Sequence, residues 1–451
     1  MWVHLPISAL AENVRVGILS DLDKLELFGT GIHIGERRSI YETVAIPQTL
    51  AITIRRQRIE GQSNKWFYEI ENRLGSRLGS ATTTLQGESQ LPSRSKTQQI
   101  YSEYLSVQAV QLSLFGKSVY PRLLLKATGS KIQVVAVVPF DFYLAGVLAS
   151  EVPMSWPTEF LKAQAVAIRS YTLNTVQERR QQLVQLEGSV KDQVFEYERL
   201  VKNTYWQKAH QVIEQTKNIQ LTNSASGTAY KAYYHADCGG QTATATQVWG
   251  PAQKDQVRNA HSISKGLTNG LSAGASTSAA VALDPYCPLN PKAKWSFHIS
   301  KTELQEKLIK HFSLPATFRL KSLQAQSLDS SPVKERIFDL TISFESSQEI
   351  VTRSMKAHDF RGLLGFFDFR STKFEWEEKN NEFWFKGSGF GHGVGLCQWG
   401  ASNMAKAGKS YLEILSHYYP QAKIVLDQNL TTQKLTTTRT ANIRTTDITK
   451  M

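Results

Sequence analysis

Short runs of β-branched and aromatic residues, separated by glycine, asparagine and charged residues, recur through the first 125 positions of the chain. Runs of this kind, bounded by turn-forming residues, are typical of β-strands. We therefore expect a β-rich N-terminal domain over residues 1–130, with a polar surface loop at 75–99. The clearest strand candidates are VRVGIL, GIHI, TVAIPQTLAITI and KWFYEI, which begin at positions 14, 31, 43 and 65.

The segment KIQVVAVVP at 131–139 is the most apolar strand candidate in the chain, and we expect it to be buried. A helix should follow, because apolar residues recur after it at the helical spacing i, i+3, i+4. The residues on this face are Leu144, Val147, Leu148 and, at i+7, Glu151. Pro153 is expected to end the helix, because proline lacks the backbone N–H that a further turn needs.

A second helix is predicted to begin near Thr158, because Pro157 then lies in the first turn, where its missing N–H costs nothing. We expect it to continue to about residue 187, and three small residues would let it approach its neighbours closely: Ala163, Ala165 and Ala167. The charged, helix-prone residues that follow are interpreted as a helical insertion at about 178–225.

From residue 228 the pattern returns to strands and loops, and the alternation at 316–377 predicts a second β-rich unit. A Ser/Ala/Gly-rich stretch at 264–282 is interpreted as an exposed loop. The expected fold class is α+β, with a mixed core and one or two β-rich accessory units. Beyond the N-terminal domain we predict a core at 131–300, an accessory unit at 301–377, a Gly-rich segment completing the core at 378–426 and a disordered Thr-rich tail at 427–451.

The composition fits a globular protein of two or three domains, since the chain has 451 residues of which 41% are hydrophobic. No apolar run approaches the roughly 18 residues that a membrane-spanning helix needs, so we expect no transmembrane segment. The opening residues MWVHLPISAL lack the basic start and the continuous apolar stretch of a signal peptide. We interpret the numbering as beginning at a trimmed, mature N-terminus.

The chain is basic, with 52 Lys and Arg against 39 Asp and Glu, a formal charge of +13. Such a surface attracts polyanions, a class that includes nucleic acids, acidic lipids and the anionic polymers of bacterial cell walls. The basic residues are scattered, and the densest cluster, Arg179-Arg180, is interpreted as a solvated helix face rather than a nucleic-acid patch. We therefore expect no nucleic-acid partner.

Glu151 is the most informative residue for chemistry. A carboxyl group on an apolar helix face loses hydration when it ionises, so its pKa should rise, as a general acid near neutral pH requires. The alternative is that the apolar face ends at Ser150 and Glu151 is simply solvated. Arg169 and Tyr171, 18 and 20 positions further on, could approach it in a helix hairpin, with an exposed helical arginine as the alternative.

The chain has three cysteines, which excludes a disulfide scaffold but permits one bridge and one further thiol. His235 and Cys238 have the short spacing of two metal ligands, and Cys287 could supply a third. A disulfide between Cys238 and Cys287 is equally compatible with the sequence in an exported protein.

Five glycines surround His392 in the segment GSGFGHGVGLCQWGA at 387–401. Glycine at this density predicts tight turns and the close approach of a ligand or another strand. His392 and Cys397 raise the hypothesis of a Cys–His nucleophile pair, against the alternative of a structural histidine beside a buried thiol.

Four motifs that occur in order along the chain resemble the SpoIID/LytB family, which includes the sporulation stage II protein D and the amidase enhancers. They are LAGVLASEVPMSWPTEFLKAQAVAIRSYTL from residue 144, YHADCGGQTATATQVWG from 234, FRGLLG from 360 and GSGFGHGVGLCQWGASNMAKAGKSYLEILSHYYP from 387. The resemblance implies a SpoIID-like core with helices around Glu151.

The resemblance also implies a reaction. Sporulation members are lytic transglycosylases that cut the bond between N-acetylmuramic acid and N-acetylglucosamine in peptidoglycan and leave 1,6-anhydro ends. They prefer strands whose stem peptides a partner amidase has removed, and their chemistry requires no cofactor. The family's catalytic glutamate corresponds to Glu151. The implied partners are therefore glycan strands and a cell-wall amidase, and the implied location is the cell envelope of an exported protein.

The remaining site residues follow from the same motifs. Arg169 and Tyr171 match the family's "A.A.R.Y" pattern and are assigned to substrate positioning. The other residues expected to line the groove are His392, Gln398 and the apolar rings of Trp156 and Trp399, with a place in the core as the alternative for the two rings.

The chain also differs from some relatives in ways that leave two questions open. Relatives replace Cys238 by Ser or Thr and Cys397 by Ser, so neither thiol is essential to the family's chemistry. One branch binds zinc near the segment matching 235–238, which leaves a structural zinc ion open here. Because enhancer members share the motifs, the alternative function is a non-catalytic, wall-binding enhancer of an N-acetylmuramoyl-L-alanine amidase.

Overall fold

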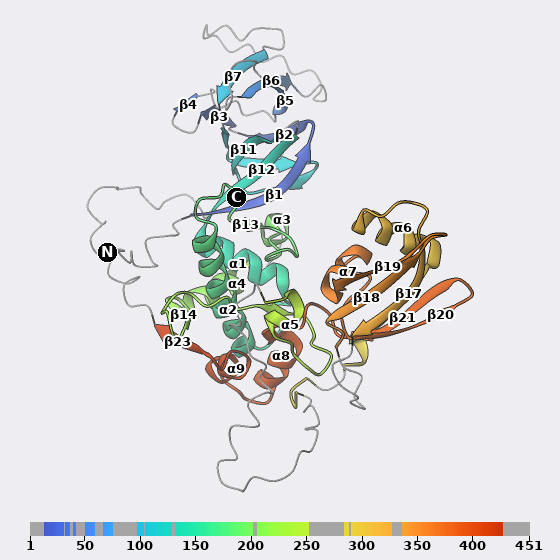
Figure 1. The fold of residues 1–451 in the computed structure, drawn as a ribbon. Helices are drawn as coiled ribbons and strands as arrows, with labels where there is room; N and C mark the ends of the chain where they lie inside the picture. The colour runs from blue at the N-terminus through green and yellow to red at the C-terminus, as the bar shows by residue number, and fades with distance from the viewer. Residues whose placement is uncertain are drawn as a thin grey trace, which may run out of the picture. The chain divides into compact units, whose positions relative to one another are not determined.

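The computed structural model describes residues 13–30, 32–36, 39–41, 50–58, 66–74, 97–102, 104–128, 131–201, 205–251, 284–287, 290–326 and 336–426 (Figure 1). Three predicted segments therefore lie wholly or largely outside the described residues: the loop at 75–99, the Ser/Ala/Gly-rich stretch at 264–282 and the tail at 427–451. The mixture of helices and small sheets confirms the predicted α+β class.

The chain divides into two compact units. Unit 1 comprises Met1–Met154, Thr172–Lys217 and Asn429–Met451, and unit 2 comprises Ser155–Tyr171 and Asn218–Gln428. Each unit is described by itself below. Among the helices of the described residues, none has both the length and the apolar character that crossing a membrane demands.

Unit 1 contains two antiparallel β-sheets with one short parallel edge, as the N-terminal pattern predicts. The larger sheet has the order β13-β1-β12-β11-β8-β3-β4, with strands Leu186–Glu187, Asn13–Leu22, Lys131–Pro139, Arg122–Thr128, Tyr104–Gln108, His33–Glu36 and Ser39–Tyr41. The smaller sheet has the order β10-β9-β2-β5-β6-β7, with strands Lys117–Ser118, Gln111–Leu114, Leu25–Thr30, Leu50–Arg58, Trp66–Leu74 and Thr97–Ser102.

Strand β12 is the predicted apolar strand, and it lies between β1 and β11 in the larger sheet. Its inner residues are buried, and it pairs antiparallel with β1, with Val14 opposite Val138 and Val16 opposite Ala136. Helix α1, Phe140–Glu151, follows β12 without a loop. This direct connection fixes where α1 starts relative to the sheet.

Helix α1 is more buried than its sequence pattern predicts. Residues 143–150 are all buried, so the helix has apolar surroundings on every side rather than one apolar face. Gly146 permits this on one side, because a Cβ atom there would lie 2.4 Å from the ring of Phe195. The helix ends at Glu151, and Val152 is extended, as expected for a residue before Pro153.

Helix α2, Thr158–Glu178, starts where predicted but ends nine residues earlier than the sequence pattern suggests. The predicted helical insertion is also wrong for residues 179–196, which form turns and strand β13; helix resumes only in α3, Tyr197–Val201, and α4, Trp206–Gln215. A long-range contact explains why this segment is not helical. The Arg15 side chain on β1 donates to the carbonyl groups of Gln182 at 2.7 Å and Leu183 at 2.8 Å. These contacts hold the segment against the sheet.

Unit 2 contains the Gly-rich segment and the second β-rich region. Short pairs join β14 (Ile219–Asn223) to β23 (Ala422–Leu426) and β15 (Tyr234–His235) to β22 (Leu396–Cys397). Three helices of this region are α5 (Ala245–Trp249), α8 (Gln398–Lys406) and α9 (Tyr411–Tyr418).

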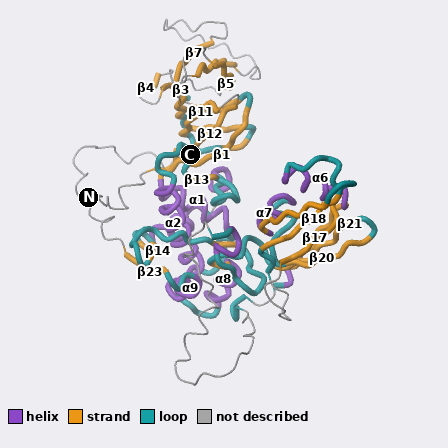
Figure 2. The backbone as a smooth tube through the Cα atoms, viewed as in Figure 1, coloured by secondary structure: helices purple, strands orange, loops and turns teal. Residues whose placement is uncertain are grey.

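Two three-stranded sheets of unit 2 share one apolar core with helices α6 (Lys301–Phe312) and α7 (Ala357–Leu364). Figure 2 shows the backbone of these strands and helices. Their orders are β16-β21-β20, with strands Lys294–Ser300, Glu382–Ser388 and Phe374–Lys379, and β17-β18-β19, with strands Arg319–Gln326, Asp339–Glu345 and Ile350–Lys356. The alternation predicted at 316–377 corresponds to β17 through β20, with α7 among them.

The contact between Gly146 and Phe195 makes a testable prediction about stability. Gly146→Ala should destabilise unit 1 by about 1–3 kcal/mol through overpacking, although alanine favours a helix interior by about 1 kcal/mol over glycine. Thermal or urea unfolding measures the change, and adding Phe195→Leu should restore part of the loss. A more stable Gly146→Ala protein would contradict the contact.

Candidate active site

Glu151 lies at the end of α1 in unit 1 and is partly exposed as a residue, while its carboxyl group is desolvated by burial. Its Oε1 atom accepts a hydrogen bond from the Val194 backbone N–H at 2.8 Å. Burial raises the pKa of Glu151 from 4.5 to about 7, and the Val194 bond, which favours the carboxylate, offsets part of that rise. The raised pKa expected from the sequence is therefore present, and the fully solvated alternative is not.

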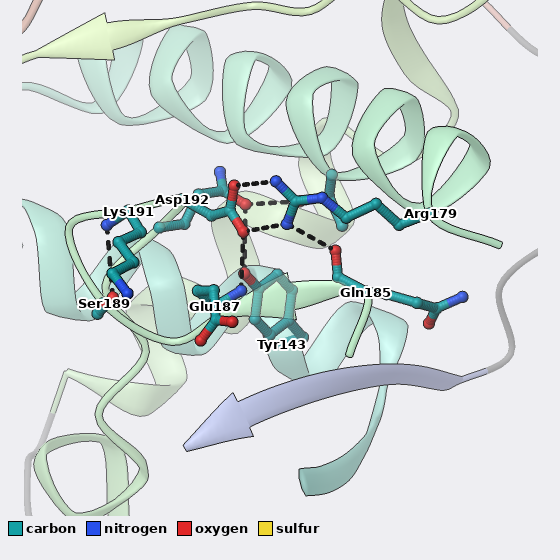
Figure 3. A network of polar contacts seen from close by, with 9 residues as sticks. Tyr143, Arg179, Gln185, Glu187, Ser189, Lys191 and Asp192 are labelled. Carbon is teal, nitrogen blue, oxygen red and sulfur yellow. Dashed lines mark hydrogen bonds and ion pairs between the residues drawn. The ribbon is translucent and has the colours of Figure 1, made fainter. Parts of the chain in front are cut away.

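A carboxyl group with these properties can act as an acid and as a base in turn. With a pKa of about 7, about half of the molecules carry the proton at neutral pH. The partial exposure of Glu151 leaves the group accessible to a substrate, while its desolvation keeps both protonation states close in free energy. Figure 3 shows the polar network that precedes Val194 in the chain, formed around Arg179 and Asp192.

The second set of predicted residues lies in unit 2, where the structure brings a histidine and three cysteines together. Strands β15 and β22 pair in parallel with His235 opposite Cys397. The ligand atoms of His235, Cys238 and Cys397 lie within 4.8 Å of one another, and Cys287 Sγ lies 3.5 Å from Cys397 Sγ. All three cysteines are free thiols, including the Cys238 and Cys287 considered as a disulfide pair.

The donor set of this cluster fits a tetrahedral metal ion such as zinc. The Nδ1 atom of His235 lies 3.0 Å from the carbonyl oxygen of Val394, and its buried Nε2 atom has no hydrogen-bond partner among the described residues. Burial lowers the pKa of His235 to about 3, so its imidazole is neutral and can offer a lone pair. An orphaned histidine nitrogen beside three buried thiols is the arrangement that a structural zinc site requires.

Buried cations surround the cluster. Arg336 donates to the carbonyl oxygen of Cys238 at 2.8 Å, and Lys373 donates to that of Gly239 at 2.7 Å. Hydrogen bonds from Cys238 and Cys397 lower the pKa of the Cys287 thiol. These thiol donors therefore favour a thiolate at Cys287, which is the protonation state that binds metal.

The Gly-rich segment makes the cluster possible through close backbone approach, as the sequence predicts. Gly391 and Gly395 have φ values of 113° and 72°, which side chains other than glycine rarely adopt. A Cβ atom at Gly395 would lie 2.0 Å from the carbonyl oxygen of Tyr233, and one at Gly391 would lie 2.7 Å from the Cβ of His235. The partner that approaches is thus another segment of the protein.

His392 lies beside this cluster in a group of aromatic rings. Its ring centroid is 5.6 Å from that of His235, 6.0 Å from that of Tyr233 and 5.1 Å from that of Trp249. Its Nδ1 atom accepts from the Val394 N–H at 3.0 Å, and burial holds its pKa well below 6.5. The neutral ring therefore carries its proton on Nε2 and offers a hydrogen-bond donor.

The other predicted residues of unit 2 differ in accessibility. Trp156 and Trp399 are partly exposed and meet at a ring distance of 6.2 Å. Arg169 is only 3% exposed and donates to the carbonyl oxygen of Ile219, and Tyr171 is 6% exposed with its ring against Tyr233. The remaining residue is Gln398, which is also buried, at the start of α8.

The hypothesis of a Cys397–His392 nucleophile pair does not fit the geometry. Cys397 has no exposed surface, and burial raises the pKa of its thiol well above 9. A nucleophilic cysteine needs access to substrate and a lowered pKa. The alternative, a buried thiol next to a structural histidine, is the one that the structure supports.

Sequence reasoning missed two contributions to these sites. Arg179, interpreted as part of a solvated helix face, pairs with Asp192, whose side chain is 2% exposed; only Arg180 is exposed. The sequence pattern presents Cys397 as a nucleophile or a buried thiol, outside the candidate metal-ligand set, whereas the structure places it with His235 and Cys238. A signal for this was present, since histidine and cysteine, two residue types that bind zinc, occur together in both motifs.

Comparison with known proteins places these residues in a family. A family model described as stage II sporulation protein, SpoIID, matches residues 128–223. The stage II sporulation protein D of Bacillus subtilis is 27% identical over 303 residues, covering 65% of this chain and 76% of that protein. An amidase enhancer of the same organism is 27% identical over 294 residues. These matches support the resemblance of the chain to the SpoIID/LytB family.

The similarity covers different shares of this chain and of its relatives. The match to the amidase enhancer covers 61% of this chain but only 39% of the enhancer. An uncharacterised protein of Brachyspira hyodysenteriae is 27% identical over 369 residues, covering 81% of this chain and 88% of that protein. The matched family segment contains Glu151, Arg169 and Tyr171, while the cluster around His235 follows it in the chain.

The raised pKa of Glu151 predicts how stability depends on pH. Between pH 4.5 and 7 the folded state keeps a proton that the unfolded state has released, so the free energy of unfolding falls as pH rises through this window. The loss amounts to about 3 kcal/mol by pH 8. Glu151→Gln should lack it, so that urea unfolding at pH 4 and pH 8 shows a smaller decrease for the variant. Equal decreases in both proteins would rule out the raised pKa.

Proposed function

We propose that this protein is a peptidoglycan lytic transglycosylase that cleaves the bond between N-acetylmuramic acid and N-acetylglucosamine. The observation that carries the proposal is the Glu151 carboxyl group, which burial holds at a pKa of about 7 in a residue that is itself partly exposed. The family, which is associated with cell-wall lysis, and the relative named stage II sporulation protein D support it. The substrate would be glycan strands whose stem peptides an amidase has removed, in the cell envelope.

The proposed mechanism uses one carboxyl group twice. Protonated Glu151 donates its proton to the glycosidic oxygen, and the bond from that oxygen to C1 of the muramic acid breaks. The 6-hydroxyl oxygen of the same sugar bonds to C1, and its proton passes to the Glu151 carboxylate. Atoms and charge balance without a water molecule or a second carboxyl group, which ordinary glycosidases need. The proton returned to Glu151 prepares the next cycle.

Residues of unit 2 are proposed to bind glycan in their own right. Trp156 and Trp399 are partly exposed, so their rings can pack on sugar faces. His392 offers an Nε2–H donor to a sugar oxygen. Arg169 and Tyr171 are buried, and we propose that they position substrate through the strands and rings they hold, as does buried Gln398.

The test is digestion of purified peptidoglycan, both intact and amidase-stripped, with products resolved by mass spectrometry. The wild-type protein should release 1,6-anhydro-muramic ends from stripped strands, and Glu151→Gln should lower the rate by about a hundredfold or more, since general acid–base catalysis contributes on that scale. Glu159→Gln is the matched control, because the Glu159 carboxylate is paired with Lys162 and should be dispensable. Equal activity of Glu151→Gln and wild type would exclude Glu151 as the acid.

A second candidate function rests on the similarity to a protein named amidase enhancer. In that case the chain would bind the wall and stimulate an N-acetylmuramoyl-L-alanine amidase without cutting glycan. The same digestion distinguishes the two functions: no cleavage of either substrate by wild type, together with faster release of stem peptides when an amidase is added, would favour the enhancer.

We also propose that the cluster of unit 2 holds a structural zinc ion through His235, Cys238, Cys287 and Cys397. Its donor set and the orphaned Nε2 atom of His235 support this. Zinc would link the Gly-rich segment to strand β15 and would supply stability rather than a step of the reaction. The proposed cleavage therefore needs no cofactor.

Metal analysis tests the zinc proposal. Protein purified without chelators should contain about one zinc ion per chain, Cys287→Ser should contain less, and a chelator should lower the melting temperature of wild type only. Zinc-free protein with an unchanged melting temperature after chelator treatment would contradict the proposal. A Cys238–Cys287 disulfide, detected as a mass difference of about two hydrogens after reduction, would replace it.

A further inference from the structure

The loop of residues 187–196, here called the Glu151 loop, connects β13 to α3 within unit 1. Its start is held to the larger sheet, where β13 pairs in parallel with Val16 and Gly17 of β1. Near its end, Val194 provides the hydrogen bond to Glu151. The loop is thus the structure that determines the environment of the proposed catalytic acid.

An ion pair closes the middle of the loop, as Figure 3 shows. Arg179 donates to both carboxylate oxygens of Asp192, whose side chain is only 2% exposed. Asp192 also accepts from the Glu187 N–H at 2.8 Å, and Arg179 donates to the carbonyl oxygen of Gln185 at 3.2 Å. A bidentate, nearly buried pair of this kind fixes geometry as well as adding energy. It ties the loop to the C-terminal end of α2.

The residues after Asp192 attach the loop to the helices one by one. The Gln193 Oε1 atom accepts from the hydroxyl groups of Thr172 at 2.8 Å and Tyr143 at 3.3 Å. The ring of Phe195 packs against Tyr143 at 5.2 Å and against Gly146. The last attachment joins the Glu196 N–H to the Ser150 hydroxyl at 3.1 Å.

We propose that the Arg179–Asp192 ion pair is a positioning device for Glu151, holding the loop so that the Val194 N–H reaches the carboxyl group while water is kept away from it. Its consequence for activity rests on the proposed function, but its consequence for the Glu151 environment does not. Arg179 and Asp192 act through the loop and touch no substrate in this account.

The charged groups around Glu151 leave the pH dependence to Glu151 itself. Tyr143 on α1 has its pKa raised well above 10 by burial, and the charge of Asp192 is compensated by Arg179. Arg199 in α3 donates to the Ser150 carbonyl, and Lys208 in α4 donates to the Met154 carbonyl. The loop itself also carries Glu187, Lys191 and Glu196.

Loosening the loop should change the pKa of Glu151 in a predictable direction. Desolvation is the largest cause of the raised pKa, and the Val194 hydrogen bond is a smaller, opposing one. A released loop removes both, so the pKa of Glu151 should fall toward 4.5. A drop of one unit would reduce the protonated fraction at pH 7 about fivefold, and the alkaline limb of the activity profile would move to lower pH.

The experiment is a carbon-13 NMR titration of the glutamate side-chain carboxyl groups in the full chain, with the Glu151 signal assigned by Glu151→Gln. Asp192→Asn should lower the pKa of Glu151 by about one unit or more, and Arg179→Lys, which keeps the charge, should lower it less. The matched control is Glu214→Gln, which breaks an exposed ion pair with Lys217 in the same unit and should leave the pKa unchanged.

Each outcome decides the question. An unchanged Glu151 pKa in folded Asp192→Asn overturns the proposal; if that variant does not fold, Arg179→Lys provides the same comparison. On amidase-stripped glycan, Asp192→Asn should show about a fivefold lower kcat at pH 7 with KM unchanged, whereas a purely structural role would reduce the folded fraction without moving the pH profile. A lowered pKa in a protein whose wild type cleaves no glycan would support the positioning device and reject the transglycosylase.

Discussion

The removal of the Glu151 carboxyl group from water is the constraint on which the rest of this account depends. A carboxylate in such a place is costly, and a single backbone N–H from Val194 compensates only part of the cost. The group therefore stays near the balance between its two protonation states. For a reaction that needs an acid and then a base from one residue, that balance is the essential property.

Two adjacent features of the fold, the connection from β12 to α1 and the end of α1, place Glu151 in this environment. Strand β12 continues directly into α1, which is buried throughout residues 143–150, so the end of the helix is placed against packed protein. Pro153 then ends the helix, leaving Glu151 in its last turn. The Glu151 loop, which follows α2 in the chain, completes the environment of the carboxyl group through hydrogen bonds to α1 and α2.

The local part of this arrangement could be predicted from the sequence. Apolar runs and helical spacing located β12, α1 and the start of α2, and they left the burial of Glu151 as one of two alternatives. The turns that lead into the loop could not be predicted, because their conformation depends on Arg15, 168 residues from Leu183. A pattern of charged, helix-prone residues carries no information about such a distant partner.

The same limit explains the cluster of unit 2. The sequence presents His235 and Cys238 in one motif and Cys397 in another, 159 residues away from Cys238. Only the parallel pairing of β15 with β22 sets His235 opposite Cys397, and only the glycines of the intervening turns allow that approach. From the sequence alone, Cys397 can therefore be interpreted as a nucleophile or as a buried thiol. In the fold it is a buried thiol beside other residues of types that bind metal.

The central claim is that Glu151 returns its proton through an intramolecular reaction of the sugar, without water. Digestion of amidase-stripped glycan in oxygen-18 water tests this most directly, with the muramic ends analysed by mass. The account predicts anhydro ends that contain no oxygen-18, because the 6-hydroxyl oxygen of the sugar closes the ring. Reducing ends carrying one oxygen-18 atom would show that water attacks C1, and would contradict the proposed mechanism even if Glu151 proved essential.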